Sequence, residues 1–216
     1  MSRIIIFGAG GRAGRRAVAE AVGRGHRVTA VVRDPARFPE LADVGADLVS
    51  GDATSADSVA ALAVDHDAAI SAVARMDLGS SEFYVAVTEA LLDGLGRAGV
   101  DRLLAVGIGT VLETAPGVRV LDAPGFPAEA REFSLGHAAA LEVLRGADTT
   151  VDWVMLAPPP VVLDEAAEPT GRYRIGGGAV LAADEGARAF SYADLAVALI
   201  DEVERARHSR ELVAVG

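Results

Sequence analysis

A glycine-rich segment near the start of the chain has the spacing of a loop that holds the phosphates of a dinucleotide. Gly8, Gly11 and Gly14 form a G-x-x-G-x-x-G pattern directly after the apolar run Ile4–Phe7. Such a loop needs a tight turn after a strand, a backbone that a pyrophosphate can approach, and close contact between the next helix and the sheet. The start of that helix offers free amide donors and a positive dipole end to the anion. A tight turn without a ligand is the alternative. The cofactor-binding residues expected in this segment are Gly8, Gly10, Gly11, Arg12, Ala13 and Gly14.

The residues after a second apolar run bear on which dinucleotide is bound. NAD-binding proteins usually place an Asp or Glu about 20 residues beyond the loop, where it accepts from the ribose hydroxyl. Here Arg33 follows Val31 and Val32. A guanidinium matches the oxygens of the 2′-phosphate of NADP, and Arg12 can assist it. Asp34 keeps NAD open, and a solvated charge is the other interpretation of Arg33. The pattern favours NADP over NAD.

Further cofactor contacts are expected where other strands end. Asp52 follows the third apolar run and is a candidate acceptor for the adenine amine, although Asp also suits a simple turn. Small residues after the fourth run leave room beside the phosphates and ribose, and Pro158 is a candidate nicotinamide contact. The residues expected in these places are Gly51, Asp52, Ala53, Ala72, Val73, Ala74, Val106 and Pro158.

Two side chains are candidates for chemistry on a substrate. We expect His137 at the start of the helix that follows a long loop, and its ordinary pKa near ~6.5 suits proton delivery. A surface histidine is the alternative. Thr110 is a candidate hydrogen-bonding partner of a substrate carbonyl, with an ordinary loop residue as its alternative. Hydride transfer from a nicotinamide to a conjugated acceptor does not strictly require a general acid from the protein. The protein instead orients the acceptor and excludes water from the pocket.

The composition excludes several kinds of enzyme. All 20 basic residues are arginine, so the chain has no lysine for a Schiff base or for a Tyr-x-x-x-Lys pair. The tyrosines Tyr84, Tyr173 and Tyr192 are followed four residues later by Thr, Gly and Ala. No G-x-S-x-G or H-E-x-x-H pattern occurs, and the Asp65–Asp67 tripeptide is expected to be a turn, so no metal site is predicted.

Continuous apolar runs separated by helical patterns predict an α/β fold. We expect a Rossmann-type, doubly wound parallel sheet with helices on both faces and a small C-terminal substrate-side region. The segment 107–127 has no clear period, and loops of that length are usually functional lids or disordered. Ser191 and Asp194 form a capping box for a final helix. The expected strands are 4–7, 27–32, 47–49, 68–72, 103–106, 151–156 and 211–215, and the long helices are 80–98 and 128–146.

Length and charge describe the whole chain. The 216 residues carry a net charge of −11, which argues against binding to nucleic acid or an anionic membrane. No apolar run is long enough to span a bilayer, and the chain has no cysteine. We expect one domain over 1–216, with an irregular substrate-side lobe at about 158–190. We also expect a cytoplasmic location, a small-molecule substrate, and a monomer or homodimer.

These motifs together resemble the atypical short-chain dehydrogenase/reductases of the NmrA-like NAD(P)H-binding group, in particular the flavin reductase (biliverdin-IXβ reductase) branch. The resemblance implies NADP across the carboxyl ends of the strands and a small substrate pocket made by the loops after the fourth, fifth and sixth strands. A histidine stands in that branch at the position of His137. The resembling segments are 5–14, 31–35, 51–52, 99–103, 143–145, 158–159 and 170–173.

Two functions remain open from the sequence. The first is an NADP(H)-dependent oxidoreductase that transfers hydride to a small conjugated or carbonyl acceptor, such as a flavin or quinone, without a Tyr-x-x-x-Lys pair. The second is a protein that binds NADP(H) and senses its redox state without catalysis. The missing tyrosine–lysine pair keeps the second open.

Overall fold

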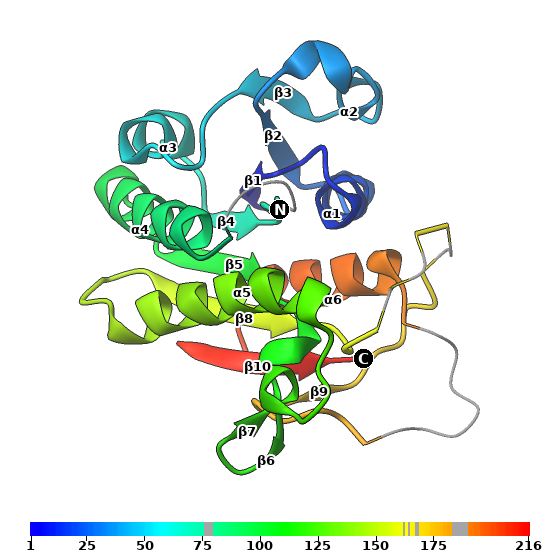
Figure 1. The fold of residues 1–216 in the computed structure, drawn as a ribbon. Coiled ribbons are helices and arrows are strands. Elements are labelled where there is room, and N and C mark those ends of the chain that lie inside the picture. The colour runs from blue at the N-terminus through cyan, green and yellow to red at the C-terminus, as the bar shows by residue number, and fades with distance from the viewer. Residues whose placement is uncertain (76–79, 162, 164, 167–168, 183–189) are drawn as a thin grey trace.

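The protein is built on one eight-stranded sheet in the order β3-β2-β1-β4-β5-β8-β10-β9. The computed structural model describes residues 1–216 except 76–79, 162, 164, 167–168 and 183–189. All neighbouring strands of the large sheet run parallel except the pair β10 and β9. Figure 1 shows the strands stacked from β3 at the top to β10 near the bottom. The strands of this sheet are β1 (Arg3–Phe7), β2 (Arg27–Val32), β3 (Asp47–Ser50), β4 (Ala68–Ser71), β5 (Arg102–Val106), β8 (Asp152–Ala157), β9 (Ile175–Gly176) and β10 (Glu211–Val215).

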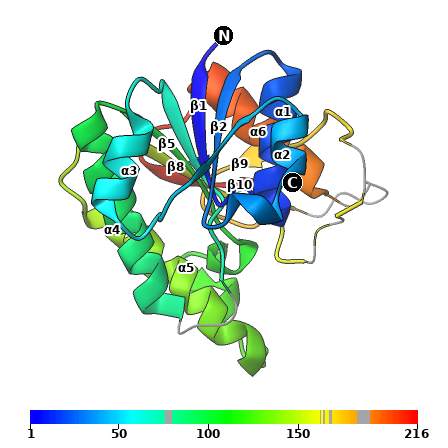
Figure 2. The ribbon, with the colours of Figure 1, turned by 90° about the horizontal axis from the view of Figure 1, so that it is seen from above.

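Helices cover both faces of the sheet. In Figure 2, α3, α4 and α5 lie on one side of the strands and α1, α2 and α6 on the other. The predicted bounds of α4 and α5 are confirmed, and Ser191 caps α6 by accepting a hydrogen bond from the Asp194 amide at 3.0 Å. The helices are α1 (Arg12–Gly23), α2 (Glu40–Asp43), α3 (Ala56–Ala63), α4 (Ser80–Ala98), α5 (Ala128–Gly146) and α6 (Tyr192–Glu204).

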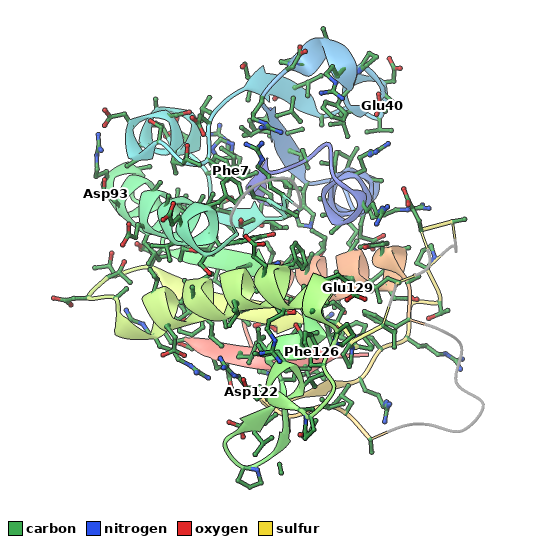
Figure 3. The ribbon with its side chains drawn as sticks, viewed as in Figure 1. Phe7, Glu40, Asp93, Asp122, Phe126 and Glu129 are labelled. Atoms are coloured by element: carbon green, nitrogen blue, oxygen red, sulfur yellow. The ribbon has the colours of Figure 1, made fainter. Side chains whose placement is uncertain are left out.

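The uninterrupted apolar run of β1 explains this layering. Side chains alternate along a strand, so a strand buried on both faces is apolar at every position. Ile5 and Phe7 pack into the core beneath α3, α4 and α5, whereas Ile4 and Ile6 pack beneath α1 and α6. In Figure 3, Phe7 lies in the interior, while Glu40 and Asp93 point outward. The predicted Rossmann-type α/β fold is confirmed.

The strand order reverses between β1 and β4. The chain builds β1, β2 and β3 outward in one direction and then returns to place β4 on the other side of β1. In open parallel sheets, ligands bind outside the carboxyl ends of the strands at such a reversal. The fold therefore predicts a ligand-binding site at the loops that follow β1 and β4.

Several segments differ from the sequence-based expectation, and the short elements α2 and β9 were also not predicted. Segment 107–127 contains two 3-10 turns, Gly109–Val111 and Val120–Asp122, and a short hairpin of β6 (Glu113–Ala115) and β7 (Val118–Arg119). It is not a loose loop, because Leu112 and Leu121 are almost fully buried. Helix α3 was not predicted; Ser55 begins it by accepting from the Ser58 amide.

The irregular segment after β8 is tied to α6. Thr170 donates through its amide and its hydroxyl to Asp194 Oδ1, at 2.7 and 2.9 Å. The Tyr173 hydroxyl donates to Asp201 Oδ2 at 2.6 Å. These contacts join residues 170 and 173 of the irregular segment to helix α6. Among the described residues, no helix has the length and hydropathy to cross a bilayer.

Candidate functional site

A large cavity lies at the carboxyl ends of the central strands. Its volume is about 1030 Å³, at the upper end of the range for ligand pockets. The walls come from the loops after β1, β2, β3, β4, β5 and β8 and from the first half of α5. Every predicted cofactor-binding and catalytic residue lines this cavity except Gly14.

The three motif glycines have three different surroundings. Gly8 has a φ of +75°, and a Cβ there would lie 2.6 Å from the Ala72 carbonyl oxygen, so the turn itself requires glycine. At Gly14 a Cβ would lie 2.2 Å from the Gly8 oxygen, so α1 can pack against the turn only without a side chain. At Gly11 a Cβ would meet only the Gly8 and Ala72 oxygens, at 3.4 and 3.7 Å. The protein leaves room at Gly11, which faces the cavity.

The turn after β2 presents cationic side chains to one end of the cavity. Arg33 is exposed and, within the described chain, forms no salt bridge. Asp34 caps the next 3-10 turn, where its Oδ1 accepts from the Ala36 amide at 3.2 Å. That bond occupies one oxygen of the carboxylate that an NAD-type ribose contact would use. Arg37 lines the same end, with its guanidinium 5.9 Å from the Phe38 ring centre.

The Asp52 carboxylate stabilises the turn in which it lies. Its Oδ1 accepts from the Thr54 amide at 2.9 Å and from the Thr54 hydroxyl at 2.7 Å. These two bonds, followed by the nearby Arg33 charge, lower the pKa of Asp52. The Asp52 carboxylate therefore stabilises a turn, which was the alternative to a contact with the adenine amine. The residue also lines the cavity.

The first residue of α1 forms an ion pair with a carboxylate of the segment that follows β8. Arg12 Nε lies 2.9 Å from Glu165 Oε2, and Arg16 donates to the Glu165 carbonyl oxygen at 2.8 Å. A hydrogen bond with Tyr192 and the charge of Glu165 raise the pKa of Arg12. An anion bound at the phosphate loop would meet Arg12 already paired with Glu165.

One face of α5 forms the other end of the cavity. Ala130, Phe133, Ser134 and His137 all line it, at the i, i+3, i+4 and i+7 spacing of a single helix face. The Phe133 and His137 rings meet edge to face, 4.9 Å between centres. The lining of the same cavity also includes Phe83, Ile108 and the Pro158–Val161 segment. This end is mainly apolar and aromatic, with the Arg75 guanidinium 5.7 Å from the Phe83 ring centre.

His137 lies deeper than the sequence suggested. It is in the middle of α5 rather than at its start and is 4% exposed, so the expected position and the surface alternative are both wrong. Burial lowers the pKa of His137 to about 3. The expected pKa near ~6.5 is therefore also wrong, because desolvation disfavours the imidazolium. At neutral pH the ring is uncharged and still has one N–H to donate.

Thr110 is connected to α5 by a chain of hydroxyl groups. Its Oγ1 donates to Ser134 Oγ at 2.9 Å, and Ser134 donates to the Ala130 carbonyl oxygen at 2.8 Å. The Thr110 proton is thus used within the protein, so Thr110 is placed to accept a hydrogen bond. The expectation that it donates to a substrate carbonyl would require this chain to break.

The loops after β5 and β8 touch through their backbones. A Cβ at Gly109 would lie 2.4 Å from the Pro158 oxygen and from the Pro160 nitrogen. Glycine at this position lets the β5 loop lie against the proline segment. Both loops line the cavity.

Several lining residues were not predicted. Phe133 and Ser134 could have been predicted from the sequence, because they lie four and three residues before His137 and therefore share its helix face. Arg37 and Phe38 follow the Pro35 turn, where no periodic pattern points to the cavity. The unpredicted lining residues include Arg37, Phe38, Arg75, Phe83, Phe133, Ser134 and Tyr192.

Comparisons with known proteins agree with this geometry. Residues 8–206 match the model of the NAD(P)H-binding family. The uncharacterized protein YwnB of Bacillus subtilis (strain 168) is 32% identical over 215 residues, which cover 99% of this chain and 97% of that protein. A structure from Burkholderia pseudomallei, described as a candidate exported protein, is 34% identical, with a TM-score of 0.86 and full coverage of both chains.

A third relative has a name that refers to an activity. The structure of a candidate NADH-flavin reductase from Streptococcus pneumoniae TIGR4 is 28% identical, covers 100% of this chain and 99% of that one, and has a TM-score of 0.85. The match of the family model extends from the phosphate loop to the end of α6. This chain therefore belongs to the NAD(P)H-binding family.

Proposed function

We propose that the protein is an NADP(H)-dependent reductase that transfers hydride to a small planar conjugated acceptor, such as a flavin or quinone. The observation that carries the proposal is that the large cavity has two unlike ends. One end has the phosphate loop and Arg33, and the other has the aromatic face of α5. A dinucleotide with its phosphates at the loop would extend toward the aromatic end and would place its nicotinamide there.

The phosphate loop supports the choice of a dinucleotide. Gly11 precedes the first residue of α1, so the free amides of that helix face the same space that a side chain at Gly11 would enter. Gly11 would let a pyrophosphate approach, and Arg33 would hold the 2′-phosphate with its guanidinium. When bound, NADPH supplies the hydride.

The aromatic end supports the choice of acceptor. Phe83 and Phe133 would hold a flat ring by stacking, and Ile108 and Pro158 would exclude water from it. A neutral His137 can donate a hydrogen bond to charge that develops on the acceptor, but it is a weak source of protons. A conjugated acceptor suits this site better than an alcohol or ketone, because its reduced form spreads the charge.

The cofactor claim is tested by binding. We expect Arg33→Ala to weaken NADPH by about 1–3 kcal/mol, or roughly 5–150-fold, and NADH by much less. Arg27→Ala is the matched control, because Arg27 is an exposed arginine at the opposite end of the same strand. Fluorescence titration with both nucleotides measures the difference. Equal losses for NADPH and NADH in the Arg33 variant would refute the 2′-phosphate contact.

The activity claim is tested by turnover. Absorbance of NADPH is followed with a panel of flavins and quinones under anaerobic conditions, with the free nucleotide as control. We expect oxidation of NADPH that depends on both protein and acceptor. Tight NADPH binding without oxidation by any acceptor would instead favour the nucleotide sensor.

A further inference from the structure

A second, much smaller cavity lies behind the large one, between the sheet and helices α4 and α5. Its volume is about 30 Å³, and Ser71, Tyr84 and Thr88 contribute polar side chains to its wall. His137 lines both the small cavity and the large one. The imidazole is therefore a partition between the two spaces.

Two buried polar atoms lie at this partition. The Tyr84 hydroxyl and His137 Nε2 are buried and make no hydrogen bond of normal geometry to the described residues. Their rings are in contact, with centres 4.3 Å apart and planes inclined by 39°. A buried polar atom without a hydrogen bond destabilises the folded state, so two adjacent ones call for an explanation.

The small cavity has the size and polarity to supply the missing partner. A buried water needs about 10–15 Å³ and two to four polar neighbours. Tyr84, Thr88 and Ser71 all border the space. The Thr88 hydroxyl donates to the Tyr84 carbonyl oxygen at 2.7 Å, which leaves its oxygen free to accept.

We propose that the small cavity holds a water bound to the Tyr84 hydroxyl and His137 Nε2, and that this contact fixes the imidazole as the tautomer with its proton on Nδ1. The tautomer of a neutral histidine is set by the hydrogen bond that its other nitrogen makes. With Nε2 accepting from the water, Nδ1 becomes the donor available to the large cavity. Tyr84 is then a positioning residue that acts through His137.

Tyr84 is suited to this role because it keeps its proton. Burial raises its pKa to about 12, although a backbone contact with Arg75 lowers it somewhat. The hydroxyl thus remains a hydrogen-bond donor to the water, and the water can in turn donate a hydrogen bond to Nε2. The catalytic meaning of the tautomer rests on the proposed reductase function, but the tautomer itself does not.

The tautomer is measured by NMR of protein labelled with ¹⁵N-histidine, without nucleotide. The chain has four histidines, so His137→Asn assigns the signal. We expect one neutral tautomer, protonated at Nδ1, in the wild type. Tyr84→Phe should raise the Nε2–H population at least several-fold. Tyr173→Phe is the control, because that hydroxyl is bound to Asp201. An Nε2–H tautomer in the wild type, or an unchanged ratio in Tyr84→Phe, would overturn the proposal.

Two further measurements keep the proposal separate from the proposed function. A high-resolution crystal structure should show a water in the small cavity, and a dry cavity would overturn the proposal even if Tyr84→Phe fails to fold. With an active acceptor, Tyr84→Phe should lower kcat about tenfold and leave NADPH affinity unchanged. If the tautomer and water are found but no acceptor is reduced, the reductase function fails and the water site stands.

Discussion

Substitution of Gly11 by alanine should separate nucleotide binding from folding. Gly11 has φ −77° and ψ 172°, a conformation open to any residue, and the added methyl would meet only two carbonyl oxygens, at 3.4 and 3.7 Å. Alanine lowers the entropy of the unfolded chain, which stabilises by about 0.4–1 kcal/mol. It is a poorer N-cap than glycine by about 1 kcal/mol. We expect the free energy of unfolding to change by less than about 1 kcal/mol.

Nucleotide binding should respond much more strongly than folding. The methyl would stand in the cavity where the pyrophosphate approaches the amides at the start of α1. Each hydrogen bond to a charged group is worth about 1.5–3 kcal/mol, so the loss of one weakens binding by roughly 10–150-fold. Both NADP and NAD should be affected alike, because they share the pyrophosphate.

Gly14→Ala is the matched control for Gly11→Ala. Its methyl would lie 2.2 Å from the Gly8 carbonyl oxygen, a backbone atom, so α1 would have to move. Forced packing of that kind costs about 1–3 kcal/mol or more. Urea denaturation and NADP titration of both variants measure the two effects. If Gly11→Ala binds NADP as tightly as the wild type, or unfolds as easily as Gly14→Ala, the assigned role of Gly11 is wrong.

Three other changes have defined outcomes. Because the folded state holds the pKa of His137 at about 3, the unfolded chain takes up that proton first on acidification. His137 should therefore remove stability as pH falls below about 6.5, by up to about 1.4 kcal/mol per pH unit, and His137→Gln should flatten the curve of urea midpoint against pH. Glu165→Gln should tighten NADP binding a few-fold in titration by releasing Arg12, and unchanged affinity would deny that Glu165 competes with the phosphates. Ser191→Ala should lower the free energy of unfolding by about 1 kcal/mol without a change in NADP affinity, since its hydroxyl caps α6 through Asp194; a change in affinity would place the cap in the site.

The elements that form the phosphate loop could be predicted because their signals are local. The run Ile4–Phe7 is apolar at every position, and glycine follows it directly. Consecutive residues therefore indicate the strand, the turn and the start of the helix. The long helices α4 and α5 carry a clear period of 3.6. Helix α3 has only Ser55 as a start signal and is mostly alanine and serine inside, so its pattern is weak.

The environment of His137 could not be predicted in the same way. Its burial comes from α4, which brings Tyr84 against a ring on α5 that lies 53 positions later in the chain. Its depressed pKa follows from burial, to which Tyr84 on α4 and Phe133 on the same helix both contribute ring contacts. Likewise, the ion pair between Glu165 and Arg12 joins positions far apart in the sequence, so it follows from the tertiary structure and not from any local pattern.

Hydride transfer itself gives the most direct test of the proposed reductase. NADPH carrying deuterium at either C4 position is mixed with the protein and an active acceptor in an anaerobic stopped-flow instrument, and the first turnover is recorded. We predict that one label is transferred to the acceptor with a primary isotope effect, that the other is retained, and that NADH reacts more slowly. A protein that binds NADPH tightly and transfers neither label to any flavin or quinone would contradict the proposed function.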